Sequence, residues 1–244
     1  METKEKITTF ETIHLSFRYI FDDFKKTLQY SFFPVLTITL LFNFLYFLNI
    51  KSVATNFTLI IILSLISLVI TSAAQRIHLD ILKGIKLNHS LISIFEIRNL
   101  KYFFLIILLT FFFIFPILVK IYLDTNSINN FFGFDNKFLI FFLIITGFVI
   151  FKFFDVLPRL SLTSIISFKL NNYSGKIFLI FLLITIIFSI PTFLIFNIQL
   201  YFITNHSDVF RILKPLFDFI SFYISYLNYL VFFAGLSYLY KNYN

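Results

Sequence analysis

Long runs of apolar residues are the feature that most limits how this chain can fold. The stretch KYFFLIILLTFFFIFPILVK, residues 101–120, contains between its two lysines only Thr110 and Pro116 that are not strongly apolar. A helix of about 20 such residues crosses the roughly 30 Å hydrocarbon layer of a bilayer. The run is apolar on every face, whereas a transmembrane β-strand alternates with a period of two residues. The stretch therefore predicts a transmembrane helix.

Six segments of the chain meet this description. Their approximate limits are 31–50, 57–74, 102–121, 138–154, 177–198 and 216–240. Hydrophobic residues make up 59% of the 244 residues and charged residues 13%, whereas soluble domains are roughly 25% charged. We therefore expect an all-α, polytopic transmembrane bundle of six helices in residues 31–240, preceded by a separate segment in residues 1–30.

The distribution of Lys and Arg predicts the orientation of these spans. Of the 20 basic residues, fifteen lie before the first span, in the second and fourth connections and after the last span, and five lie in the other connections. The cytoplasmic side carries the excess of Lys and Arg in membrane proteins, so we expect both ends of the chain there. The basic residues behind the net charge of +8 then set the orientation of the spans and contact anionic lipid headgroups. Nucleic acid is not an expected partner.

The segment before the first span, ITTFETIHLSFRYIFDDFKKTL, is amphipathic. At 100° per residue its Ile and Phe residues fall within an arc of about 140°, and Glu11, Arg18, Asp22 and Lys26 fall outside that arc. Such a helix lies in the plane of a membrane interface. A soluble helix that docks on a partner is the alternative. The second and fourth connections also mix apolar with basic residues, so we expect further amphipathic helices on the cytoplasmic side.

Two of the spans resemble each other. Residues 101–116 align with residues 176–191, KYFFLIILLTFFFIFP over KIFLIFLLITIIFSIP, and Lys, Thr and Pro coincide at identical spacing. This favours a repeated unit of an amphipathic segment and a helical hairpin, with biased composition as the alternative. Pro116 and Pro191 are each expected to kink their helix, because proline removes one backbone hydrogen bond and crowds the preceding turn.

Polar residues within the predicted spans are arranged in stripes, and no ionisable residue lies at the centre of a span, which argues against an ion-coupled transporter. Small and hydroxyl-bearing residues on one face let helices approach closely and form hydrogen bonds. We interpret the stripes as helix-packing surfaces, and a polar cavity lined by Asn43, Ser67 and Asn228 is the alternative. The positions concerned are Asn43 in the first span, Ser64, Ser67, Thr71 and Gln75 in or beside the second, and Asp218, Ser221, Ser225 and Asn228 in the sixth.

The sequence contains little that indicates catalysis. It has no Cys, which excludes disulfides and thiolate metal sites. His78, Asp80 and His89 lack the spacing of a known metal motif, and phosphate-binding loops and nucleophile motifs are absent. Asp155 and Arg159 have the spacing of a helical ion pair, to which we assign a structural role. We therefore expect no metal, no cofactor and no enzymatic activity.

Three segments beside the spans, LSFRYIFDDFKKTLQ, NHSLISIFEIRNLK and VLPRLSLTSIISFK, carry a resemblance to known proteins. In layout the chain resembles a widespread group of bacterial six-span inner-membrane proteins with no assigned activity. The resemblance implies a location in the bacterial inner (cytoplasmic) membrane and implies no substrate. We favour a non-enzymatic component that assembles with other membrane proteins or with copies of itself, or that organises lipid. The alternative is a transporter or permease subunit with a polar pathway between the second and sixth spans.

Overall fold

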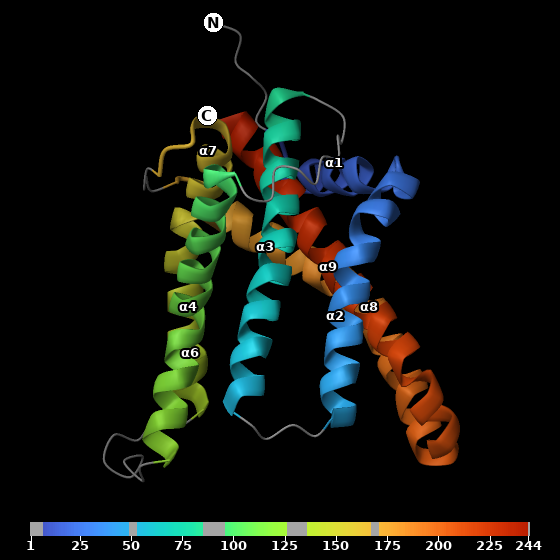
Figure 1. Cartoon of the computed structure of the whole chain (residues 1–244). Coiled ribbons are helices and arrows are strands. Elements are labelled where there is room, and N and C mark those ends of the chain that lie inside the picture. The colour runs from blue at the N-terminus through green and yellow to red at the C-terminus, as the bar shows by residue number, and fades with distance from the viewer. Residues whose placement is uncertain (1–6, 49–52, 85–95, 126–135, 167–170, 244) are drawn as a thin grey trace, which may run out of the picture.

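The computed structural model describes residues 7–48, 53–84, 96–125, 136–166 and 171–243, and no strand occurs among them (Figure 1). The all-α fold class is therefore confirmed for the described part of the chain. The helices are α1 (Thr9–Phe21), α2 (Phe24–Leu48), α3 (Val53–Lys83), α4 (Ile97–Thr125), α6 (Asn136–Phe153), α7 (Val156–Thr163), α8 (Ser174–Asn205) and α9 (Ser207–Tyr243).

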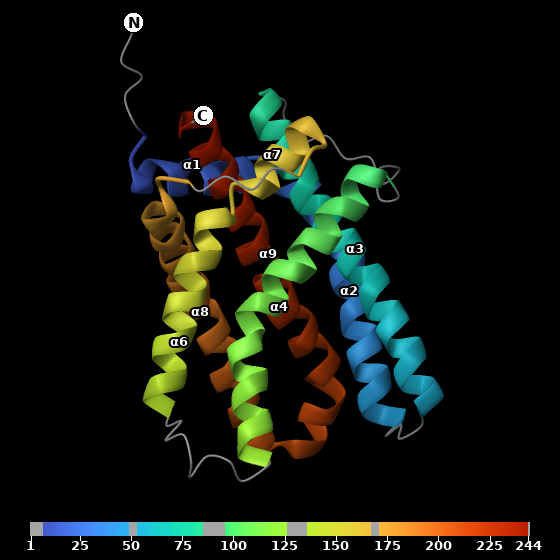
Figure 2. The ribbon, with the colours of Figure 1, turned by 90° about the vertical axis from the view of Figure 1, so that its left-hand side faces the viewer.

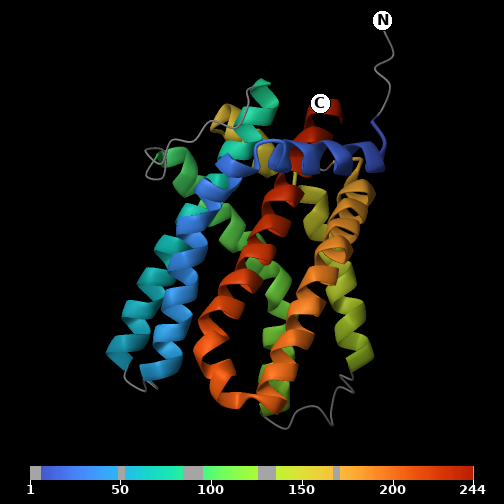
Figure 3. The same cartoon turned by 90° about the vertical axis from the view of Figure 1, so that its right-hand side faces the viewer.

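The long helices extend from one end of the bundle to the other, with α8 and α9 oblique to the rest, and α1 lies across one end of them (Figures 1 and 3). That end also carries α7 and the C-terminal end of α9, and we call it the collar end. Helix α9 crosses the bundle diagonally and packs against α8, α3, α1 and α2. The core of the protein is thus organised around its last helix.

Three helices are long and apolar enough to cross a membrane over their described residues. They are α2 over Phe24–Phe44, α8 over Ser174–Asn205 and α9 over Ser207–Tyr243. The sequence predicted six spans, and the other three expected segments fall in α3, α4 and α6, whose side chains are described only in part. Helices α8 and α9 also extend beyond their expected limits, since only His206 separates them.

The boundary between α1 and α2 differs from the expected amphipathic segment. Helix α1 begins where the Thr8 hydroxyl accepts a hydrogen bond from the Glu11 N–H at 3.2 Å, and it ends at Phe21. Helix α2 already begins at Phe24, and the Thr27 hydroxyl donates to the Ile20 carbonyl at 2.6 Å. The chain therefore turns from the collar into the bundle before residue 31, because these bonds satisfy the helix ends at the turn.

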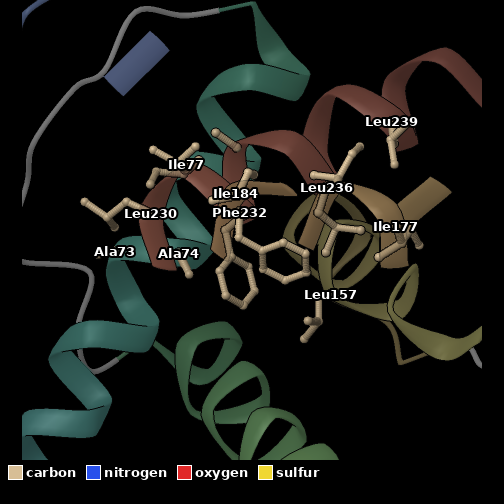
Figure 4. Close-up of a cluster of buried hydrophobic side chains, with 14 of the residues drawn as sticks. Ala73, Ala74, Ile77, Leu157, Ile177, Ile184, Leu230, Phe232, Leu236 and Leu239 are labelled. Carbon is tan, nitrogen blue, oxygen red and sulfur yellow. The ribbon is translucent and has the colours of Figure 1, made fainter. Parts of the chain in front are cut away.

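Among the side chains that the structure describes, many buried apolar ones lie in the half of the bundle near the collar end. Figure 4 shows Ala73, Ala74 and Ile77 of α3 facing Leu230 of α9, with side chains of α7 and α8 completing the cluster. Alanines at this contact let the two helices approach closely. The contact between α3 and α9, the second and sixth expected spans, is a packed apolar interface at this depth.

Much of the outer surface of the bundle is also apolar. Phe193 on α8 has 65% of its surface exposed. A surface of this kind is rare on proteins that are surrounded by water, which seldom expose large contiguous apolar patches. Other large apolar side chains exposed along α8 include Leu179, Ile186, Ile190, Leu194 and Ile203.

Neither of the prolines expected to kink a helix ends one. Pro191 lies inside α8, which is continuous from Ser174 to Asn205. Pro116 lies within α4, whose backbone is helical from Ile97 to Thr125, although the Pro116 side chain is outside the described part of the structure. A proline can lie inside a membrane helix without ending it, because neighbouring groups can satisfy the backbone carbonyl that the proline leaves free. The kinks themselves stay a prediction.

Candidate functional site

A charged cluster joins α2 to α9 away from the collar end. The Asn43 side-chain amide donates to Asp218 Oδ2 at 3.0 Å and to the Thr39 carbonyl at 2.9 Å. The Lys214 ammonium donates to the same carboxylate oxygen at 2.6 Å. The side chains of Lys214 and Asp218 are 21% and 22% exposed, and Asn43 is buried. A partly buried carboxylate with two donors is well compensated, so the cluster holds the two helices together.

The depth of this cluster follows from the length of α9. Helix α1 contacts α9 at Gly235, which lies 17 residues from Asp218. At 1.5 Å per residue this separation is about 26 Å along the helix axis, close to the roughly 30 Å thickness of a hydrocarbon layer. If α9 spans a bilayer with α1 at one surface, a charge pair at this separation avoids the cost of the bilayer centre. Sequence reasoning missed Lys214, although its spacing of four residues from Asp218 was the available signal.

The predicted polar positions of the second span do not share one environment. Thr71 is buried and its hydroxyl donates to the Leu68 carbonyl of its own helix at 3.1 Å. Gln75 is also buried, whereas Ser67 is exposed. The side chain of Ser64 lies outside the described residues.

The remaining polar positions of α9 lie apart from the charged cluster. Asn228 is ten residues from Asp218, or about 15 Å along the helix, so the structure does not bring Asn228 to Asn43. Ser225 is exposed, and its hydroxyl donates to the Ser221 carbonyl at 3.0 Å. Ser67 is exposed on α3. The three residues expected to line one cavity, Asn43, Ser67 and Asn228, therefore lie on different surfaces.

Asn228 and Ser225 line a groove of about 490 Å³ between α8 and α9. Three further polar side chains come from α8, namely Thr185, Ser189 and Thr192. The hydroxyls of Ser189 and Thr192 donate to carbonyls of their own helix at 2.7 and 2.9 Å. Because such bonds satisfy the hydroxyl donors, this polar lining is compatible with an apolar solvent. Of these five polar residues, the sequence singled out Ser225 and Asn228, as part of a stripe on the sixth span, and it predicted no groove between the fifth and sixth spans.

A second cavity, of about 480 Å³, lies among α4, α6, α8 and α9 near the collar end. Aromatic rings supply much of its wall. The ring centroid of Phe181 lies 5.4 Å from that of Phe232 and 5.7 Å from that of Phe151. Among the described residues that line it, only Thr110 and Tyr229 have a polar side chain. We call this space the four-helix cavity.

A buried histidine links α3 to the collar end of α9. His78 Nδ1 lies 2.6 Å from the Ser237 hydroxyl oxygen, and that hydroxyl donates to the Phe233 carbonyl at 2.9 Å. The imidazole Nδ1–H is therefore the donor. His78 lies beyond the expected span 57–74, at the level of the collar, and complete burial lowers its pKa to about 3. The side chain is thus neutral at physiological pH.

This shifted pKa predicts a pH-dependent stability. An unfolded chain protonates His78 below about pH 6.5, whereas the folded protein keeps it neutral down to about pH 3. The unfolded state therefore binds more protons in this window, and the free energy of unfolding falls as the pH falls. We expect a loss of about 1.4 kcal/mol between pH 7.5 and pH 5.5, measured by denaturant titration in detergent.

The control for this pH dependence is His78→Gln, which keeps a hydrogen-bonding side chain but cannot titrate. Its free energy of unfolding should change by about 1.4 kcal/mol less than that of the unaltered chain over the same pH range. An equal slope in both proteins would show that another group is responsible.

The short helix α7 is fixed at the collar end by Asp155. The Tyr173 hydroxyl donates to the Asp155 carboxylate, and Arg159 Nη2 lies 3.8 Å from it. Pro158 lies within the first turn of α7, where its missing N–H would have no helical partner. The expected ion pair therefore forms, and the proline does not interrupt it.

Within the described part of the chain, no group of three His, Asp or Glu side chains is arranged to hold a metal ion. His89, one of the residues considered for such a site, lies outside the described residues. Comparison of the whole chain with protein-family models, curated proteins and solved structures finds no match. The features that bear on function are therefore an apolar outer surface, a helix lying across the collar end, the charged cluster and two cavities.

Proposed function

We propose that this chain is a non-enzymatic integral membrane protein of six transmembrane helices, α2, α3, α4, α6, α8 and α9, in a bacterial inner membrane. Its collar end faces the cytoplasm, where it organises lipid and assembles with other membrane proteins. The lengthwise course of the six helices from one end of the bundle to the other and the apolar outer surface support this function (Figures 1 and 3). The excess of Lys and Arg in the segments expected on the cytoplasmic side supports the orientation.

The observation that carries the proposal is the way in which α1 is attached. Thr12 and Ser16 are fully buried, and Ser16 Oγ lies 3.1 Å from the ideal Cβ position of Gly235 on α9. Phe10 remains 75% exposed, and the Phe17 ring stacks on Phe188 of α8 at 5.8 Å. A helix that lies across the end of a bundle and exposes aromatic side chains fits the plane of a membrane interface. The expected apolar face of α1 is thus divided between protein contact and exposure.

The alternative function is a transporter or permease subunit, and the groove between α8 and α9 favours it. Its polar side chains lie 10 to 15 Å below Gly235 along α9, which is well inside the hydrocarbon depth. Asn228 and Thr192 line the groove from its two helices, so the variant carrying both Asn228→Leu and Thr192→Leu distinguishes the two functions. A transporter should lose its transport phenotype while it remains folded, whereas a lipid-organising component should be unaffected.

The six-span topology predicts where reporter fusions are active. Fusions after residue 90 and after residue 129 should report opposite sides of the membrane, with residue 90 on the cytoplasmic side. The chain should also stay in the membrane fraction after alkaline carbonate extraction. Signals from the same side at both positions would contradict the six-span topology, and release by carbonate would contradict membrane integration.

A further inference from the structure

We propose that the four-helix cavity holds one acyl chain of an anionic phospholipid from the leaflet at the collar end, with the lipid phosphate beside Lys101 and Lys152. This inference rests on the proposed function, because it requires the bundle to lie in a bilayer. It adds the chemical class of the lipid and the place where that lipid binds.

The lining of the cavity selects an apolar occupant. Its volume of about 480 Å³ lies within the range of roughly 300–1,000 Å³ that is typical of ligand sites. A buried water needs two to four polar partners, and among the described lining residues only Thr110 and Tyr229 carry polar side-chain atoms. Hydrocarbon can occupy such a space without losing hydrogen bonds, because the aromatic walls offer it dispersion contacts.

The cavity is open toward the side of the bundle. Ile144 of α6 is 63% exposed although it lines the cavity, and Phe178 and Phe181 of α8 are 42% and 41% exposed. Figure 2 shows α4 and α6 at this side of the molecule, with α9 behind them. A cavity whose rim is exposed on a membrane-facing surface is accessible to acyl chains from the surrounding lipid.

The depth of the cavity assigns the leaflet. Helix α8 begins at Ser174 at the collar end, and Phe178 and Phe181 follow four and seven residues later. These spacings correspond to about 6 and 10 Å along the helix. That depth lies just below the headgroups of the leaflet at the collar end, where the first half of an acyl chain is found. A lipid from the opposite leaflet would have to cross the bilayer centre to reach it.

Two lysines at the collar end supply complementary charge. Lys101 precedes the first cavity-lining residue of α4, Ile106, by five residues, and it is exposed with its ammonium 3.4 Å from the Ser164 carbonyl. Lys152 is half-buried in the last turn of α6, beside the lining residue Phe151. Basic residues at headgroup depth attract anionic lipid, and one such residue corresponds to about a fivefold preference.

Fluorescence quenching by brominated lipid tests this proposal directly, because the chain contains no Trp. The reporter is Phe181→Trp, which lines the cavity, and the matched control is Leu182→Trp, an exposed neighbour on α8 that does not line it. Each protein is reconstituted in vesicles of phosphatidylcholine that contain a small mole fraction of brominated phosphatidylglycerol or brominated phosphatidylcholine. With both lysines contributing, we expect the anionic lipid to quench position 181 about 25-fold more effectively than phosphatidylcholine does, and we expect a ratio near one at position 182.

Two further variants test whether the cavity and the two lysines cause the lipid preference. Gly147→Leu places a side chain in the cavity from α6 and should abolish the preference at position 181. The variant carrying both Lys101→Gln and Lys152→Gln leaves the cavity open and should bring the ratio to one while quenching persists. Equal ratios at positions 181 and 182, or a preference that survives Gly147→Leu, would overturn the proposal. Failure of the unaltered chain to float with the vesicles would instead overturn the proposed membrane function.

Discussion

Replacement of Gly235 by Leu should release α1 from the bundle. A Cβ at this position would lie 3.1 Å from Ser16 Oγ and 3.2 Å from Ile180 Cγ2, so the larger side chain cannot fit without moving a helix. Overpacking of this kind costs about 1–3 kcal/mol. Helix α1 has 13 residues, too few to be stable in isolation. Amide hydrogen exchange in α1 should therefore accelerate roughly tenfold or more.

The matched control is Gly175→Leu in the first turn of α8, where nothing lies within 4 Å of the ideal Cβ position. This variant should leave exchange in α1 unchanged. Gly235→Ala tests how exchange in α1 depends on the size of the side chain at this position, because its methyl group requires Ser16 and Ile180 to shift by only a few tenths of an ångström. Unchanged exchange in Gly235→Leu would mean that the contact with α9 does not hold α1 in place.

Replacement of Asp218 by Leu should destabilise the contact between α2 and α9. The change leaves the Lys214 ammonium without its carboxylate at a site where its side chain is only 21% exposed. Removal of one partner of a buried ion pair costs about 3–5 kcal/mol, and the flexible lysine near the membrane boundary can recover part of this by reaching the headgroups. We therefore expect a loss of about 2 kcal/mol in unfolding by sodium dodecyl sulfate.

The double variant Lys214→Met and Asp218→Leu removes both charges and provides the control. Because an uncharged pair leaves no unpaired ion, its stability should lie within about 1 kcal/mol of the unaltered chain. Asn43 still donates to the Thr39 carbonyl in this variant. If the single variant is as stable as the double variant, the Lys214 ammonium left without its carboxylate does not destabilise the protein.

The sequence predicted which segments are helical more reliably than which surfaces meet. Apolar composition and length indicate a membrane helix without reference to any other segment, so the helices themselves were accessible. The side of α1 that contacts the bundle could not be predicted in this way. A helical wheel counts Thr12 and Ser16 as polar and places them away from a contact. Their small volume and the absence of a side chain at Gly235 bring them against α9, because close approach depends on size as well as polarity.

The candidate site was predictable only in part, for a similar reason. Asn43 and Asp218 are polar residues in apolar surroundings, and each was visible by itself. Their hydrogen bond joins residues 175 positions apart, and no local pattern reports such a pairing. The four-helix cavity could not be predicted from the sequence, because a cavity depends on how well side chains from several helices fill the space between them.

The attachment of α1 to α9 has a consequence for how this protein adapts to membranes of different thickness. In the proposed membrane orientation, the contact of α1 with Gly235 sets the position of the bundle relative to the membrane surface at the collar end. Helices α8 and α9 contain 32 and 37 residues, about 48 and 55 Å, which exceeds a hydrocarbon layer of roughly 30 Å. Near their hairpin Ile212 is 78% exposed. A thicker bilayer would cover this spare apolar length or reduce the helix tilt, so in the proposed orientation hydrophobic mismatch is absorbed at the end opposite the collar while α1 keeps its depth.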